Sequence, residues 1–301
     1  MKFRTLGVSG LRVSVIGMGT WQLGGEWGKQ FAQAEVDAMF DAARDCRINL
    51  IDTAECYGDH TSERLIGAAI RRDRAQWVVA TKFGHRYAGH LQRSDERSGR
   101  DATTQVEASL TALQTDYIDL LQYHSIRDSE FDNDELTGVL ERLVESGKVR
   151  HLGNSIAGSI NTLHQVEEST RRHVQAIQVI YNRLDRRPED GLFQSCQRQN
   201  LGVLGRVPLA SGYLSGKYHP GSRFAAGDVR AGHDPQTIDR KLLQVEQIAR
   251  EEVPAGMEIA PWALAWCLDH PAVTAVIPGC KDAAQVRANA SAAEIALSNR
   301  Q

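Results

Sequence analysis

Short runs of valine, isoleucine and leucine alternate along this chain with longer stretches in which apolar residues recur every three or four positions. The short runs have the length and composition of buried strands, and the longer stretches have the period of amphipathic helices. Eight strands are predicted, at residues 13–17, 48–52, 77–81, 118–123, 149–154, 176–180, 202–207 and 272–277. Helices are predicted between them, for example at residues 34–46, 62–72, 103–114 and 134–146.

This order of elements predicts an α/β fold, a (β/α)8 TIM barrel, because a parallel sheet needs helices on its outer face and eight such strands close into a ring. An N-terminal β-hairpin is predicted in residues 3–11, which we expect to plug the bottom of the barrel. Residues 208–239 are rich in glycine, serine and proline and predict a long loop after strand 7, which we expect to be a lid. No linker interrupts the pattern, so residues 1–301 are expected to form a single domain.

The composition disfavours several classes of partner and site. The 301 residues are 42% hydrophobic and 24% charged with a net charge of -3, and the acids and bases are mixed along the chain. Neither nucleic acid nor a membrane is therefore expected as a partner. The five cysteines are scattered without a CxxC pair, and residues 1–10 lack the apolar stretch of a secretory signal. We expect a cytoplasmic protein with reduced thiols and no metal site.

Polar residues follow several of the apolar runs. Asp52, Lys82 and His124 each follow directly on an apolar, strand-like run, and Tyr57 lies in the loop after the first of these runs. Because the carboxyl ends of barrel strands open onto one face, these four side chains are expected to converge there. Each alone has an ordinary structural explanation, such as a helix cap, a solvated lysine or a loop aromatic. Their joint occurrence at successive strand ends favours a catalytic site.

These four residue types fit proton-coupled hydride transfer. A free phenol has a pKa of about 10, and a nearby ammonium lowers that value. Asp52 would hold Lys82 in place, His124 would orient a substrate carbonyl, and Tyr57 would protonate the carbonyl oxygen as a general acid. No side chain supplies a hydride, so a cofactor is expected.

Several motifs resemble those of the aldo-keto reductases, over essentially the full chain. They are IDTAECYG (51–58), SERLIG (62–67), TK (81–82), DLLQYH (119–124), LGNS (152–155), VPLASGYLSGKY (207–218) and IPGCK (277–281). The resemblance implies the same barrel and the same catalytic roles for Tyr57, Lys82, Asp52 and His124.

The resemblance also implies a site for a nicotinamide cofactor. Ser155 and Gln178 match residues that hold the carboxamide, whereas Ile156 replaces the family's asparagine, and Arg206 stands where an aromatic residue is frequent. The full set of implied cofactor contacts is Gly19, Thr20, Trp21, Asp52, Ser155, Gln178, Arg206, Pro208, Leu209, Ser211, Gly212, Gly216, Lys217, Gly279, Lys281, Gln285 and Asn289.

Lys281 is the residue that we expect to bind a 2′-phosphate and so to select NADPH or NADP+ over NADH, and the alternative is a solvated lysine at a helix start. Asp228 and Arg230 in the expected lid resemble a pair that closes over the cofactor, and the alternative is a surface ion pair.

The residues and the resemblance together predict an NADPH-dependent reductase of aldehydes or ketones, reversible toward the alcohol, with sugars or polyols as possible substrates. The expected substrate pocket comprises Trp21, Trp27, Tyr57, Phe83 and His124, with His85, Tyr87, Arg127 and Arg183 at its mouth. An alternative is a nicotinamide-binding regulatory or partner subunit with residual reductase activity. A metal-dependent barrel enzyme is disfavoured, because Lys82 would repel a cation placed between Asp52 and His124.

Overall fold

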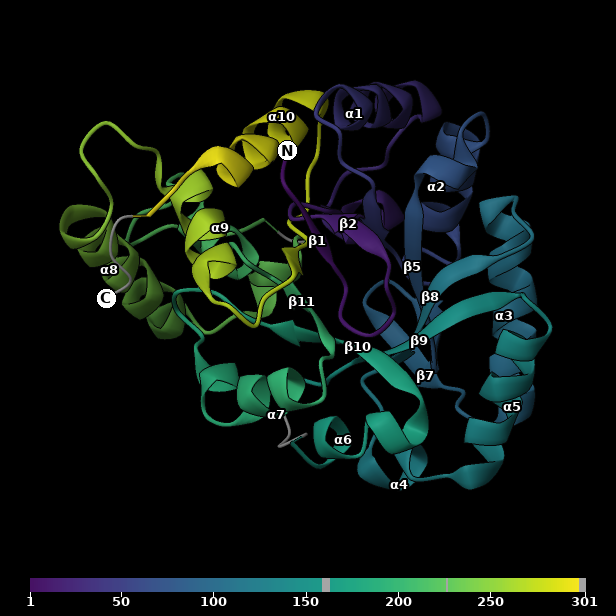
Figure 1. Cartoon of the computed structure of the whole chain (residues 1–301). Helices are drawn as coiled ribbons and strands as arrows, with labels where there is room; N and C mark the ends of the chain where they lie inside the picture. Colours follow the sequence, from purple (N-terminus) through teal and green to yellow (C-terminus); the bar gives the residue numbers. More distant parts are fainter. Residues whose placement is uncertain (159–162, 226, 298–301) are drawn as a thin grey trace.

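A closed ring of eight parallel strands forms the centre of the protein (Figure 1). The computed structural model describes residues 1–158, 163–225 and 227–297. The strands in ring order are β3 (Met18–Gly19), β4 (Leu50–Asp52), β5 (Val78–Phe83), β8 (Ile118–His124), β9 (Val149–Ser155), β10 (Val174–Ile180), β11 (Gly202–Arg206) and β12 (Ala275–Val276). Parallel bridges from Ile16 to Val276 and from Gly19 to Gly279 close the ring. The α/β fold and the (β/α)8 TIM barrel are thus confirmed.

Helices surround the ring and cover the outer face of the strands (Figure 1). They are α1 (Gln33–Asp45), α2 (Thr61–Ile70), α3 (Gly99–Leu113), α4 (Asp128–Phe131), α5 (Asp134–Glu145), α6 (Leu163–Glu167), α7 (Leu192–Arg198), α8 (Pro235–Glu251), α9 (Ile259–Asp269) and α10 (Ala283–Ser291). Local sequence starts several of them: Ser98 and Asp101 form a capping box at α3, and Asn133 caps α5. No helix in these described ranges has both the length and the apolar character to cross a bilayer.

Successive side chains of each strand alternate between the two faces of the ring. Ile51, Val79 and Leu121 belong to the large cluster that also contains the helices' apolar faces. Their neighbours Leu50, Val78 and Leu120 belong to a second cluster, which fills the interior of the barrel. Because the side-chain period of a strand is two residues, polar residues two or four positions further along also face inward. This alternation decides which polar residues reach the site.

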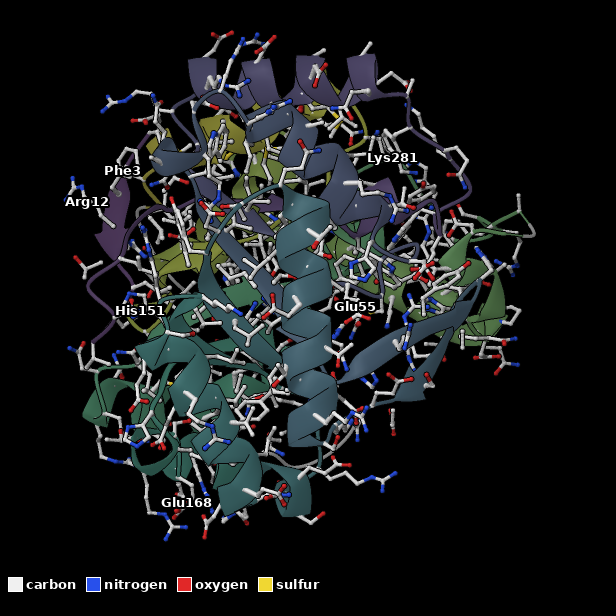
Figure 2. The ribbon with its side chains drawn as sticks, turned by 90° about the vertical axis from the view of Figure 1, so that its right-hand side faces the viewer. Phe3, Arg12, Glu55, His151, Glu168 and Lys281 are labelled. Carbon is white, nitrogen blue, oxygen red and sulfur yellow. The ribbon has the colours of Figure 1, made fainter. Side chains whose placement is uncertain are left out.

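The N-terminal hairpin closes one end of the barrel. It consists of β1 (Phe3–Thr5) and β2 (Arg12–Ser14), paired antiparallel. Leu6 and Val13 are fully buried and pack with the inward-facing residues of the strands. In Figure 2 the labelled Phe3 and Arg12 lie at one end of the molecule, and the labelled Glu55 and Lys281 lie toward the other. The predicted plug is confirmed.

The predicted strand at 13–17 was wrong in its position. Its first residues belong to the hairpin, because Val13 pairs antiparallel with Arg4, and the barrel strand is the short β3 that follows. The apolar run is continuous across both elements, so periodicity alone does not divide it.

A second hairpin, which the sequence did not predict, extends from the end of β5. Its strands are β6 (His85–Gly89) and β7 (Gln92–Asp95). The segment carries mostly polar and charged residues and is largely exposed, so it lacks the apolar alternation that identifies a strand.

The long segment after β11 is present, but it ends earlier than predicted. It contains the short turns of 3-10 helix at Ala210–Ser215 and Val229–Gly232. The last residues of the predicted loop 208–239 instead open α8, which Asp234 caps and which has Pro235 in its first turn.

We predict that Leu6→Ala lowers the free energy of unfolding by roughly 2–5 kcal/mol, because it leaves a cavity inside a closed barrel end. Urea-induced unfolding of the wild type and the variant would measure the difference. Val8→Ala on the same hairpin is the matched control, since Val8 is 50% exposed. An equally small effect of both substitutions would contradict the plug.

Candidate active site

Three of the expected catalytic residues are brought together by neighbouring strands. Asp52 ends β4, Lys82 is the penultimate residue of β5, and His124 ends β8. The register pairs Asp52 with Ala80 and Lys82 with Gln122, so the strand ends are nearly level. Each residue lies an even number of positions from an inward-facing apolar residue of its own strand. The strands therefore direct all three side chains into the same end of the barrel.

Lys82 is the centre of this group. Its Nζ donates to Asp52 Oδ2 at 2.8 Å, to the carbonyl oxygen of Thr53 at 2.7 Å and to Tyr57 Oη at 3.3 Å. Lys82 and Asp52 are only 2% and 4% exposed. Burial by itself lowers the pKa of Lys82, but the charge of Asp52 and the contact with Tyr57 raise it by more. Lys82 is therefore an ammonium held beside the phenol.

Tyr57 and His124 complete the tetrad. Their rings are nearly perpendicular, with centroids 6.2 Å apart. Burial raises the pKa of Tyr57 above its ordinary value, although Lys82 opposes this shift. Lys82 thus lowers the pKa of the phenol, as expected, but desolvation of the phenolate is the larger effect and the pKa is raised. Burial, and then the charge of Lys82, hold the pKa of His124 well below its ordinary value, so the imidazole is neutral.

A close backbone approach fixes the loop that carries Tyr57. A side chain at Gly24 would place its Cβ 2.6 Å from the carbonyl carbon of Tyr57. Gly58 has φ +65°, and a Cβ there would lie 2.3 Å from the carbonyl oxygen of Gly24. Only glycine fits at either position. The loop after β3 and the loop after β4 are thus packed backbone against backbone beside the phenol.

A buried amide network lies behind the ion pair. Gln178 Nε2 donates to Asp52 Oδ1 at 2.6 Å and to Gln122 Oε1 at 3.1 Å. Gln122 Nε2 also donates to Asp52 Oδ1, at 3.2 Å, and Ser155 Oγ donates to Gln178 Oε1 at 3.2 Å. The structure therefore brings Ser155 and Gln178 together, as expected for residues that hold one group. Gln122 was missed, although its place between Leu120 and His124 in the strand's period of two was a signal for it.

Aromatic rings form one wall beside Tyr57. Trp21 stacks on Tyr57 with centroids 6.1 Å apart, and Trp27 meets Trp21 edge-on at 5.3 Å. His85, from the second hairpin, lies 4.9 Å from the His124 ring. Trp21, Trp27 and His85 therefore lie beside Tyr57 and His124, and their part in a substrate pocket stays a prediction.

Phe83 does not line this pocket. It is 1% exposed and packs against Tyr123 in the layer between sheet and helices. Its position next to Lys82 places it on the opposite face of β5, so its assignment to the substrate pocket was wrong.

The two arginines expected at the mouth lie in the loops after β8 and β10. Arg183 is paired with Glu252 at 2.7 Å, and Arg127 is exposed at the start of α4. Tyr87 lies on β6 with the Arg93 guanidinium 5.6 Å from its ring.

A buried ion pair that the sequence did not indicate fastens the second hairpin to the site. Glu26 is 1% exposed, and both of its oxygens accept from Arg93 Nη2, at 2.7 and 2.6 Å. Glu26 also accepts from Trp21 Nε1 at 2.6 Å and from the amide of Leu91. Both charged residues lie in irregular or polar segments, so no periodicity marked them.

Cys56, beside Tyr57, also contacts His124, with Sγ 3.8 Å from Nδ1.

The backbone after β11 has a conformation suited to close contact with a ligand. Val207, Ala210 and Ser211 have φ of +55°, +50° and +58°, and Gly212 and Gly216 follow with φ of +90° and +74°. Positive φ is uncommon outside glycine, and for a β-branched residue it is a strained exception that clusters at functional sites. Pro208 is buried, Leu209 is half-buried, and Lys217 is exposed at the end of this segment.

Arg206 ends β11 close to the tetrad. Its Nη2 donates to the carbonyl oxygen of Ile156 at 2.9 Å, while its Nε is buried without a hydrogen-bond partner among the described residues. Burial lowers the pKa of Arg206. A buried donor that lacks an acceptor is costly, so this position fits a ligand that supplies one.

The expected lid pair is not a surface ion pair. Arg230 is 5% exposed, and its guanidinium donates to both oxygens of Asp228 and to the carbonyl oxygen of Ser211. It also lies 4.0 Å from the centre of the Phe224 ring and 5.6 Å from that of Trp27. Arg230 thus joins the lid to the segment after β11 and to the loop after β3.

The last expected contacts lie between β12 and α10. Gln285 Oε1 accepts from the Lys281 amide at 3.0 Å, and Asn289 Nδ2 donates to the Gly279 carbonyl at 3.4 Å. These side chains brace the turn that carries Lys281. The hydrogen bond from Arg230 holds the pKa of Asp228 below its ordinary value, and the charge of Lys281 adds to this effect. Gly19 and Thr20 lie at the adjoining end of β3, and Thr20 Oγ1 donates to the Asp52 carbonyl.

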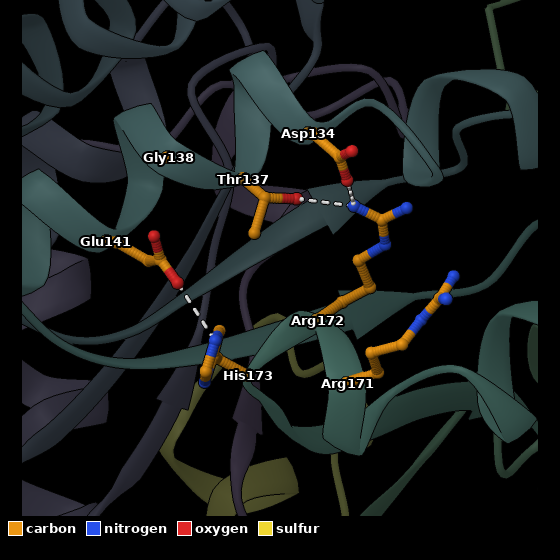
Figure 3. A pocket seen from close by; sticks show the side chains of 7 residues that line it. All are labelled: Asp134, Thr137, Gly138, Glu141, Arg171, Arg172 and His173. Carbon is orange, nitrogen blue, oxygen red and sulfur yellow. Dashed lines mark hydrogen bonds and ion pairs between the residues drawn. The ribbon is translucent and has the colours of Figure 1, made fainter.

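A pocket of about 360 Å³ lies elsewhere, between α5 and the segment before β10 (Figure 3). Its lining residues are Asp134, Thr137, Gly138, Glu141, Arg171, Arg172 and His173. Arg172 pairs with Asp134, and a ring nitrogen of His173 lies 2.8 Å from a Glu141 carboxylate oxygen, so these side chains already have partners. None of these residues lies at the carboxyl end of a strand, where Asp52, Lys82 and His124 lie, and we propose the tetrad as the active site instead. Among the described residues no three histidine, cysteine or carboxylate side chains form a metal-binding cluster.

Comparison with known proteins identifies the family. Residues 15–301 match the model of the aldo/keto reductase family. The aldo-keto reductase YhdN of Bacillus subtilis is 30% identical over 96% of this chain and 87% of its own length. The NADH-specific methylglyoxal reductase of Escherichia coli is 31% identical over 99% of this chain and 95% of its own length. A "Probable voltage-gated potassium channel subunit beta" of Oryza sativa is 28% identical over 98% of this chain and 92% of its own length.

Solved structures of aldo-keto reductases are also similar to this chain. The holo form of aldo-keto reductase AKR11C1 from Bacillus halodurans has a TM-score of 0.82, 30% identity, and coverage of 99% of this chain and 93% of that one. The glycerol dehydrogenase AKR11B4 from Gluconobacter oxydans has a TM-score of 0.80 and 26% identity. The match covers 99% of this chain and 91% of that one. The chain belongs to the aldo/keto reductase family. It is an oxidoreductase of the class that uses a nicotinamide cofactor.

Glu55, two residues before Tyr57, is a buried carboxyl group that makes the stability of the fold depend on pH. It is 3% exposed, its Oε2 has no hydrogen-bond partner among the described residues, and burial raises its pKa to about 7. The folded state thus holds a proton that the unfolded state loses at lower pH, so this group's contribution to stability falls as pH rises from about 4.5 to about 7.

We predict that Glu55→Gln removes this loss, which amounts to roughly 3 kcal/mol at most. The free energy of urea unfolding at pH 5 and pH 8 would show a smaller decrease for the variant than for the wild type. Glu145→Gln makes the same change at an exposed position and should leave the decrease unaltered. Equal pH dependence in wild type and Glu55→Gln would refute the shift.

Proposed function

We propose that this protein is an NADPH-dependent reductase of small aldehydes or ketones, reversible toward the alcohol, with sugars or polyols among its substrates. The observation that supports it most is the buried chain from Asp52 through Lys82 to Tyr57, next to a neutral His124. These contacts join a proton donor, Tyr57, to a positive charge that Asp52 holds in place, and both charged side chains are buried.

The proton steps follow from the geometry of the tetrad. The raised pKa of Tyr57 keeps the phenol protonated, so it is ready to donate to a carbonyl oxygen. Once the proton has moved, Lys82 stabilises the phenolate, and Asp52 compensates the charge of Lys82. His124, as a neutral imidazole, donates a hydrogen bond to the same substrate oxygen. The nicotinamide, when bound, supplies the hydride.

The residues that would hold the cofactor fit it on several counts. Ser155, Gln178 and Arg206, whose Nε lacks a hydrogen-bond partner among the residues that the structure describes, lie beside the tetrad and offer hydrogen-bonding groups. The backbone of residues 207–212 has positive φ at four positions, a conformation that clusters at functional sites, and we assign the pyrophosphate to it. The start of α10, with Lys281, would take the adenosine end.

Preference for NADPH over NADH rests on Lys281. The E. coli relative is named as NADH-specific, so membership of the family does not decide this preference. Lys281 places a cation on the turn before α10 that Gln285 and Asn289 brace.

The proposed substrate class rests on the shape and polarity of the mouth. Trp21 and Trp27 provide an apolar wall, whereas His85 and His124 provide polar groups next to the phenol. A small molecule with a carbonyl and further hydroxyl groups would use both. Two relatives are named for methylglyoxal and glycerol, which are small and rich in oxygen.

The alternative is a regulatory or partner subunit, as the name of the rice relative suggests for that protein. The complete tetrad favours catalysis. We also propose that residues 1–301 form a single domain and that the protein acts in the cytoplasm, where its free thiols would stay reduced.

We predict that Tyr57→Phe lowers kcat by at least about 100-fold, because it removes the general acid. NADPH affinity, measured by fluorescence titration, should stay within about twofold, since the phenol hydroxyl acts on the substrate. Turnover is measured as NADPH consumption with a panel of small aldehydes, ketones and sugars. Tyr123→Phe, which removes a buried hydroxyl from the outer face of β8, is the matched control.

Undiminished turnover of Tyr57→Phe would remove Tyr57 from the mechanism. Tight NADPH binding by the wild type without turnover of any carbonyl would support the partner-subunit alternative instead.

We predict that Lys281→Ala weakens NADPH binding roughly tenfold and NADH binding hardly at all, because a charge-assisted hydrogen bond to the 2′-phosphate is lost. Dissociation constants for both cofactors would measure the effect. Arg287→Ala is the matched control, since Arg287 lies on α10 and pairs with Asp45 instead. Equal weakening of both cofactors would contradict the assignment.

A further inference from the structure

Cys56 occupies an unusual place in the active site. It lies directly before Tyr57, is 1% exposed, and places its Sγ 3.8 Å from His124 Nδ1. Within residues 1–158, 163–225 and 227–297, it is the side chain that reaches a ring nitrogen of His124 at hydrogen-bonding distance. The roles assigned above to the tetrad make no use of this contact.

The contact matters because a neutral imidazole carries a single ring proton. Which nitrogen holds that proton is decided by the hydrogen bond that the other nitrogen makes. A thiol can donate its S–H, and it can accept only weakly. A thiol that stays protonated beside Nδ1 therefore favours a proton on Nε2.

The surroundings keep both groups in the required state. Burial raises the pKa of the Cys56 thiol to about 11, so the sulfur retains its proton at neutral pH. The charged or titratable groups that act on His124 are Lys82, His85, Arg206 and Arg93, and all of them disfavour the imidazolium. The ring is consequently neutral, and its tautomer is the remaining variable.

The second hairpin supports the sulfur from the other side. The charge of Arg93, on β7, lowers the pKa of the Cys56 thiol, against the larger effect of burial. Glu26 holds the Arg93 guanidinium by two short contacts. Because a guanidinium has no acceptor, it offers the thiol's S–H no partner, and the S–H is left to donate to His124 Nδ1.

We infer that Cys56 is a positioning residue that holds His124 as the Nε2–H tautomer, so that the imidazole presents a donor to the substrate oxygen. The inference rests on the proposed function for its catalytic meaning. The tautomer itself is a property of the protein and can be measured without turnover.

The test is nuclear magnetic resonance of protein labelled with 15N-histidine, in which the shifts of the two ring nitrogens report the tautomer. His124→Gln would identify the His124 signals by their disappearance. We expect the wild type to carry the proton on Nε2 at neutral pH. In Cys56→Ala, we expect a substantial population with the proton on Nδ1, and in Cys56→Ser a smaller one, because serine keeps a donor.

Kinetics provides a second readout. Cys56→Ala should lower kcat for a carbonyl substrate roughly five- to tenfold, the effect of one neutral hydrogen bond, with cofactor affinity unchanged. Cys56→Ser should recover part of that loss. Cys196→Ala is the matched control, because it truncates a fully buried cysteine on α7 and leaves the His124 signals and kcat unchanged.

A wild type with the proton on Nδ1 would overturn the inference, and so would Cys56→Ala with an unaltered tautomer. Both results are independent of whether any carbonyl is reduced. Failure of the proposed function would show itself differently, as the absence of turnover in a wild type whose His124 is the Nε2–H tautomer.

Discussion

The ion pair between Lys82 and Asp52 is the interaction on which the site depends. Two charges withdrawn from water are costly unless each finds its counter-charge and further hydrogen bonds. Here the lysine has a carboxylate, a backbone carbonyl and a phenol, and the carboxylate has two amides. The pair can exist only where strands β4 and β5 place both side chains inside the barrel. The position of Tyr57, and of the amides behind Asp52, follows from satisfying that pair.

Much of this arrangement could be predicted from the sequence. The alternation of apolar runs with helical stretches is sufficient for the barrel, because eight parallel strands have few other ways to bury both faces. Asp52, Lys82 and His124 could be placed at one end, since each directly follows an apolar run. The period of two within a strand would also have found Gln122, and would have removed Phe83 from the pocket, had it been applied residue by residue.

Other features could not be predicted because they depend on partners distant in sequence. Glu26 and Arg93 lie in segments without periodicity, and only the fold shows that they meet. The second hairpin lacks apolar alternation, since it contacts the active site through His85 and Arg93 instead of packing an apolar face on the core. The division of residues 13–19 between hairpin and barrel depends on antiparallel pairing with Arg4. The net pKa shift of Tyr57 depends on burial, which residue identity alone does not specify.

The packing of Gly24 against Gly58 has a consequence for how this protein can change over time. The separation between the two loops is set by main-chain atoms, with no side chain between them. Substitutions among the aromatic and polar residues around the mouth can therefore alter which molecule fits, while the phenol keeps its distance from the lysine. Recognition and chemistry are separately adjustable here, and a new substrate preference need not be accompanied by a rebuilt reaction centre.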